Sequence, residues 1–140
     1  MSGTTLSGEP LALPADAKGH AAMLVVGFTK AAVKATRPWI EACRADGSML
    51  CFDVRMLESV PRWLRGTVER GMRSGYPPEL QRRTLLVYEG NDAWRKVLNV
   101  SDDDAAYVVV LDSDSTVRAT ATGPCSPDAL RKILPGTSSR

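Results

Sequence analysis

The sequence predicts an α/β fold in which a mixed sheet is sandwiched between helices. Three observations support this prediction. Apolar runs alternate with helical patterns between residues 22 and 98, two further strand-like runs flank an Asp/Ser-rich turn, and a capped helical pattern follows them. Alternating strands and helices are typical of a parallel sheet, and the later hairpin adds antiparallel strands to it.

The predicted elements of the first half are a strand over 22–28, a helix from Ala31 or Thr36 to Asp46, and a strand over 49–57. The first strand is apolar at successive positions, as expected where both faces of a strand are covered. Gly47 gives the helix a C-terminal stop, and Trp39 and Cys43 lie on its apolar side.

The predicted elements of the second half are a helix opening at Ser59, a strand over 84–88, a short helix capped by Asn91 or Asp92, strands over 107–111 and 116–122, and a final helix with Ser126 as N-cap and Pro127 at its first position. Leu64, Val68 and Met72 recur every four residues on the helix that follows Ser59. We interpret Trp63 and Trp94 as core anchors, with Val97 also pointing inward.

The composition is typical of one soluble domain. The chain has 140 residues, of which 44% are hydrophobic, and its net charge of +2 gives no overall attraction to nucleic acid. The longest apolar runs, 21–28 and 105–111, are far shorter than the roughly 18 residues that indicate a membrane span. We expect a domain over 11–134, with flexible ends at 1–10 and 135–140.

The N-terminal residues lack the basic start and apolar stretch of a signal peptide. We therefore expect a cytoplasmic protein, or a periplasmic one if the chain has been trimmed from a longer precursor. Cys43, Cys51 and Cys125 form no CxxC pair, and His20 is the single histidine. This pattern argues against a zinc site, and we expect neither a metal nor a cofactor.

Two segments resemble thioredoxin-like proteins of the peroxiredoxin and TlpA type. Residues 13–19, followed by an apolar strand ending in Phe28, are similar to the entry of those proteins. Residues 107–112, with their turn and Val117, resemble the hairpin that those families place after a cis-proline. The resemblance covers 11–134 and implies a thioredoxin-like three-layer sandwich, a mixed central sheet with helices on both faces.

The redox residues of those families are absent. A thioredoxin-type enzyme needs a thiolate at the start of the first long helix and a second thiol three residues later. That window falls on 33–36, and the peroxiredoxin nucleophile falls near Thr36 and Arg37. The cis-proline falls near Ala105 or Ala106. The sequence therefore predicts a redox-inactive member and argues against an enzyme.

The mitochondrial ATP synthase assembly factor family resembles this chain in its GF strand end at residues 27–28, its tryptophan at position 39 and its AY-to-LD hairpin over 106–112. The resemblance implies a polypeptide-binding or assembly role with a protein or peptide partner of unknown identity. The predicted binding groove lies between the loop before the first helix and the residues before Tyr107. Its candidate binding residues are Thr29, Lys30, Lys34, Thr36, Arg37, Ala105 and Ala106.

The alternative function is a one-cysteine thiol peroxidase or reductase that uses Cys125. Cys125 directly precedes the predicted N-cap Ser126, where a helix N-terminus lowers the pKa of a thiol. The other two cysteines are interpreted as inert.

Two charged segments are interpreted as solvated surface. The first is the aspartate triplet at 102–104, whose spacing fits no EF-hand loop. The second is an arginine-rich segment over 55–83, which lacks a nucleic-acid-binding motif.

Overall fold

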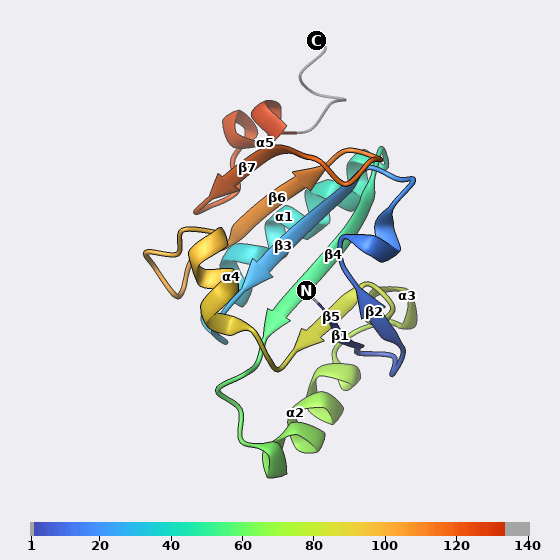
Figure 1. The fold of residues 1–140 in the computed structure, drawn as a ribbon, viewed down its shortest axis with the longest axis vertical. Helices are drawn as coiled ribbons and strands as arrows, with labels where there is room; N and C mark the ends of the chain where they lie inside the picture. The colour runs from blue at the N-terminus through green and yellow to red at the C-terminus, as the bar shows by residue number, and fades with distance from the viewer. Residues whose placement is uncertain (1, 134–140) are drawn as a thin grey trace.

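The computed structural model describes residues 2–133, which form a seven-stranded mixed sheet between layers of helices (Figure 1). The strands are β1 (Ser2–Thr5), β2 (Pro10–Ala12), β3 (Ala22–Gly27), β4 (Leu50–Met56), β5 (Thr84–Val87), β6 (Tyr107–Leu111) and β7 (Val117–Thr122). Their order across the sheet is β2-β1-β5-β4-β3-β6-β7. The pairs β3·β4 and β4·β5 are parallel, whereas β6, β7, β1 and β2 join antiparallel to their neighbours.

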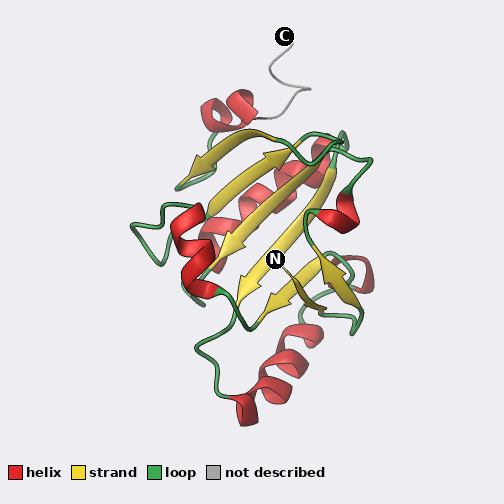
Figure 2. Cartoon of the chain, viewed as in Figure 1, coloured by secondary structure: helices red, strands yellow, loops and turns green. Residues whose placement is uncertain are grey.

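Helices cover both faces of the sheet (Figure 2). They are α1 (Val33–Asp46), α2 (Arg62–Ser74), α3 (Pro78–Gln81), α4 (Asn91–Val97), α5 (Pro127–Ile133) and the short 3₁₀ helix η1 (Ala15–Ala17). Side chains of α1 and α5 share one core cluster, and side chains of α4 and η1 belong to the cluster on the opposite face. The predicted three-layer arrangement is confirmed.

Strand β3 separates the two core clusters, and all six of its residues are buried. Leu24 and Val26 pack on the α4 side, whereas Met23 and Val25 pack on the α1 side. On that second side Trp39 is fully buried, and its indole N–H donates a hydrogen bond to the carbonyl oxygen of Gly123 at 3.0 Å. Strand β3 is therefore apolar at successive positions because both of its faces are buried, as the sequence predicts.

Two helix ends have the predicted caps. Gly47 adopts the left-handed conformation with φ of 72° and donates its N–H to the carbonyl of Cys43. The hydroxyl of Ser126 accepts the N–H of Ala129 at 3.1 Å, as an N-cap does. The predicted cap of α4 is wrong, because Gly90 occupies that position and no side chain caps the helix.

The N-terminal segment differs from the expected flexible end. Residues 2–12 form the β1–β2 hairpin, and β1 pairs with β5 through Thr4 opposite Leu86 and Thr5 opposite Leu85. This pairing covers the edge of β5, whose backbone groups would otherwise be exposed. The expected tail at 135–140 lies outside the described residues.

Two predicted core positions are wrong. Trp63 is 79% exposed, because α2 buries none of its side chains completely. Val97, in the last turn of α4, is 71% exposed, whereas Trp94 of the same helix packs against the core as predicted. Across residues 2–133 no helix combines the length and apolar character needed to cross a bilayer.

Candidate functional site

The start of α1 holds no reactive group. Val33 and Thr36 occupy the ends of the window in which the resemblance places the two redox cysteines. Thr36 is fully buried, and its hydroxyl donates to the carbonyl of Val33 at 3.3 Å. Ala106, at the expected cis-proline position, is also fully buried. Two of the candidate binding residues, Thr36 and Ala106, are therefore packed inside the protein.

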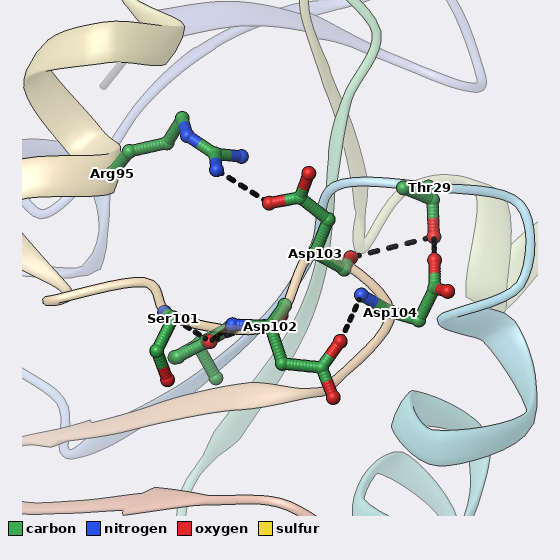
Figure 3. Close-up of polar contacts among 7 residues, drawn as sticks. Thr29, Arg95, Ser101, Asp102, Asp103 and Asp104 are labelled. Carbon is green, nitrogen blue, oxygen red and sulfur yellow. Dashed lines mark hydrogen bonds and ion pairs between the residues drawn. The ribbon is translucent and has the colours of Figure 1, made fainter.

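The two loops that were predicted to flank a groove are bonded to each other (Figure 3). The hydroxyl of Thr29, in the loop before α1, donates to the Asp104 carboxylate at 2.7 Å. Asp103 forms an ion pair with Arg95 of α4. The aspartates thus anchor the loop before β6, and within residues 2–133 no group of acidic, Cys and His side chains is placed to hold a metal. Lys30 and Lys34 point into solvent as exposed side chains.

Cys43 and Cys51 form a disulfide that joins α1 to β4. Cys43 lies in the last turns of α1 and is fully buried, whereas Cys51 is the second residue of β4 and is partly exposed. From the sequence alone, both cysteines are expected to be inert. The signal that could have paired them is their position, because the tight turn at Gly47 returns the chain from the apolar side of the helix to the adjacent strand.

The disulfide borders an open pocket of about 590 Å³. Its floor is β4, where Cys51, Asp53 and Arg55 occupy alternate positions and therefore face the same side of the sheet. This is the α1 side, since Cys51 packs against the cluster that contains Trp39.

The walls of the pocket carry more charge than its floor. One wall is a face of α1 with Arg37, Glu41 and Arg44. The opposite wall is the segment from the end of α2 to the start of β5, which contributes Glu79 and Arg83. Of the candidate binding residues, only Arg37 lines this pocket.

Asp53 and Arg55 form a buried ion pair at the pocket floor. The Arg55 Nε and the Asp53 Oδ1 are 3.1 Å apart but lack hydrogen-bond geometry, whereas an Arg55 Nη2–H donates to Asp53 Oδ2 at 3.3 Å. Arg55 also donates to the hydroxyl of Tyr76 at 3.1 Å. Burial raises the pKa of Asp53, and the opposing attraction to Arg55 offsets only part of this effect.

Cys125 is the free cysteine, and it is partly buried beside the α1-side cluster. Burial raises the pKa of its thiol. The sequence predicts the opposite direction, a lowering of the thiol pKa by the start of α5.

No protein-family model matches the chain, and no curated protein matches it. Solved structures do share its fold. The exposed lipoprotein thioredoxin Etrx1 of Streptococcus pneumoniae strain TIGR4 aligns with a TM-score of 0.63 at 13% identity, over 96% of each chain. A secreted Mycobacterium tuberculosis disulfide oxidoreductase, described as homologous to Escherichia coli DsbE, aligns with a TM-score of 0.61 at 16% identity. The alignment covers 100% of this chain and 96% of that protein. A protein described as a thiol:disulfide interchange protein DsbE from Chlorobium tepidum aligns with a TM-score of 0.66 at 13% identity. The alignment covers 98% of this chain and 92% of that protein.

These findings correct the expectation of a redox-inactive polypeptide-binding or assembly factor, which is wrong. The chain contains the Cys43–Cys51 disulfide, and the structures that share its fold are described as a thioredoxin and as thiol–disulfide exchange proteins. The comparisons do not support the resemblance to the mitochondrial ATP synthase assembly factor family. The architecture predicted from the sequence is confirmed, and the chain has a thioredoxin-like fold.

Proposed function

We propose that this chain is a thiol–disulfide oxidoreductase whose redox pair is Cys43 and Cys51. The observation that carries the proposal is the position of Cys51, which is partly exposed and lines an open pocket while bonded to a buried partner. A disulfide that is accessible from one side is a substrate for exchange with an incoming thiol. The thiol–disulfide chemistry in the descriptions of the similar structures supports the same class of reaction.

The difference in burial between the two sulfurs sets the direction of attack. Cys43 is fully buried, so an external thiolate reaches the disulfide at Cys51. The thiolate forms a new S–S bond to Cys51 Sγ, the Cys43–Cys51 bond breaks, and its electron pair leaves on Cys43 Sγ. Because Cys43 lies in an apolar cluster, its thiolate takes up the proton that the incoming thiol gave up. A second thiol then releases Cys51 and completes a two-electron reduction.

The proposed chemistry favours an oxidising compartment. Structural and catalytic disulfides persist in exported proteins, whereas cytosolic reductants keep most thiols reduced. We therefore favour the periplasmic location over the cytoplasmic one. Two of the similar structures are described as a secreted protein and as an exposed lipoprotein.

A second candidate is a one-cysteine thiol peroxidase or reductase that uses Cys125. It belongs to the same broad chemistry as the similar structures, and Cys125 is a free and partly accessible thiol. Its raised pKa reduces the thiolate fraction that such an enzyme needs. For this reason we place the Cys43–Cys51 pair first.

The test is the reduction of a protein disulfide, such as that of insulin, by dithiothreitol in the presence of the chain. We expect the wild type and Cys125→Ser to accelerate it and Cys43→Ala/Cys51→Ala to be inactive. Activity lost only in Cys125→Ser would support the one-cysteine candidate instead. No acceleration by the folded wild type, or full activity in the double-alanine variant, would overturn the proposal.

A further inference from the structure

We propose that the pocket beside Cys51 selects small thiols that carry carboxylate groups, with Arg37 and Arg44 supplying the attraction. This inference rests on the proposed function, because it names the substrate class of the same site. It identifies the thiol by size and charge.

The concave shape of the site supports a small molecule. A pocket of about 590 Å³ falls within the range of roughly 300–1,000 Å³ that is typical of small-molecule sites. Cys51 lies on its floor, between a wall formed by α1 and a wall that contains Tyr76 and Leu80. A small thiol can therefore approach Cys51 inside the pocket.

The charges that remain available in the pocket favour an anion. Asp53 and Arg55 form an ion pair at the floor, and Arg37 also attracts the Asp53 carboxylate. The other charged lining residues are three arginines and two glutamates, namely Arg37, Arg44, Arg83, Glu41 and Glu79. The pocket walls therefore carry more positive than negative charge. The low-dielectric walls of a cleft concentrate the electric field of such charges on a ligand inside it.

Arg37 and Arg44 are the cations best placed to act on a ligand. They are seven residues apart on α1, so they lie on the same face about two turns apart, roughly 10 Å along the helix axis. Both are exposed, and within residues 2–133 neither forms an ion pair or a side-chain hydrogen bond. Arg44 lines the same pocket as Cys51.

The small thiol itself supplies the electrons that reduce the protein disulfide, so the reaction needs no other reductant. One carboxylate-bearing thiol forms a mixed disulfide with Cys51 and releases Cys43, which is protonated. A second molecule of the thiol attacks the sulfur of the first, and the electron pair returns to Cys51. Two thiols are oxidised to one small disulfide, and the protein gains two thiols. The reverse reaction oxidises the protein with the small disulfide.

The test compares a dianionic thiol, mercaptosuccinate, with a neutral one, 2-mercaptoethanol. The rate of opening of the disulfide in the folded protein is followed by alkylation and mass spectrometry. Each rate is divided by the rate of the same thiol with a small neutral disulfide, which removes differences in intrinsic nucleophilicity. The variants are Arg37→Gln/Arg44→Gln and a control with the same change of charge, Arg70→Gln/Arg131→Gln, whose residues do not line the pocket.

We expect the preference for mercaptosuccinate to fall about fivefold in Arg37→Gln/Arg44→Gln and to remain in the control, with 2-mercaptoethanol unchanged in both. Added salt should reduce the wild-type preference. An equal fall in the control, or an equal slowing of both thiols, would overturn the inference while leaving the proposed function intact. If neither thiol opens the disulfide of the folded wild type, the proposed function itself fails.

Discussion

Cys43 and Cys51 are eight residues apart in the sequence, and their disulfide ties the last turns of α1 to the start of β4. The bond lies ten residues along α1 from Val33, which corresponds to roughly 15 Å along the helix axis. The N-terminal end of the helix dipole, which stabilises a thiolate in the first turn, does not act at this distance. Cys51 instead lies among the charged residues that line the pocket.

Removal of the disulfide should lower the stability of the fold. A cross-link that closes an eight-residue loop restricts the unfolded chain and contributes about 2.5 kcal/mol in the loop-entropy model. We expect Cys43→Ala/Cys51→Ala to unfold at a lower urea concentration than the oxidised wild type. Its free energy of unfolding should be lower by about the same 2.5 kcal/mol. Cys125→Ala, which removes a thiol outside the loop, is the control. Equal midpoints for the oxidised wild type and the double variant would contradict this expectation.

The buried carboxyl of Asp53 should make stability depend on pH. Burial raises the pKa of Asp53 above its ordinary value of 3.8, so the folded state binds this proton more tightly than the unfolded state. The free energy of unfolding therefore falls as the pH rises from the unfolded pKa through the folded one. Asp53→Asn cannot titrate, so its stability relative to the wild type should rise as the pH increases above the unfolded pKa of Asp53.

Urea unfolding of both proteins as a function of pH measures the effect. Glu79→Gln removes an exposed carboxyl of the same pocket and serves as the control, for which we expect no such gain. The assignment to Asp53 fails if the difference between Asp53→Asn and the wild type stays constant with pH or declines.

The hydrogen bond between Thr29 and Asp104 should hold the loop before β6 in place. Thr29→Val removes the donor of the 2.7 Å bond, at a cost of about 0.5–1 kcal/mol. Hydrogen exchange at residues 101–106 should become faster in this variant. Thr29→Ser keeps the hydroxyl and should exchange like the wild type. Equal protection in the valine and serine variants would show that the bond does not restrain the loop.

Trp63 should behave as a surface residue. Because it is 79% exposed, Trp63→Phe should remove the tryptophan fluorescence that acrylamide quenches most readily. The same change should alter the free energy of unfolding by less than about 0.5 kcal/mol. Trp39→Phe is the contrasting variant, because it loses the bond to Gly123 and leaves space in the core. A stability loss in Trp63→Phe as large as that in Trp39→Phe would refute the exposed position.

The architecture could be predicted because its elements have local causes. The apolar run of β3 and the stop at Gly47 are properties of a few neighbouring residues. The β1–β2 hairpin could not be recognised, because β1, which contains Ser2 and Gly3, is stabilised by pairing with β5, which is distant in the sequence. Trp63 was misplaced for a related reason, since the periodicity of α2 does not show whether a sheet lies beneath it.

The Cys43–Cys51 pair could not be predicted from the resemblance, which places the redox residues in the first turn of α1. Cys43 and Cys51, each taken alone, are typical of buried structural cysteines. Their pairing depends on how α1 packs against β4, which the sequence does not state. The role of Arg55 was hidden in the same way, because six other arginines occur between it and residue 83, while Arg55 itself is buried against Asp53.

The most direct test of the central claim is the rate at which 2-mercaptoethanol opens the Cys43–Cys51 disulfide as a function of urea concentration below the unfolding transition. If the thiol reaches Cys51 through the pocket of the folded protein, the rate stays constant as urea is added. If the disulfide is accessible only after global unfolding, the logarithm of the rate rises linearly with urea, with the slope of the equilibrium transition. We predict the constant rate, and the rising line would contradict an exchange site in the native fold.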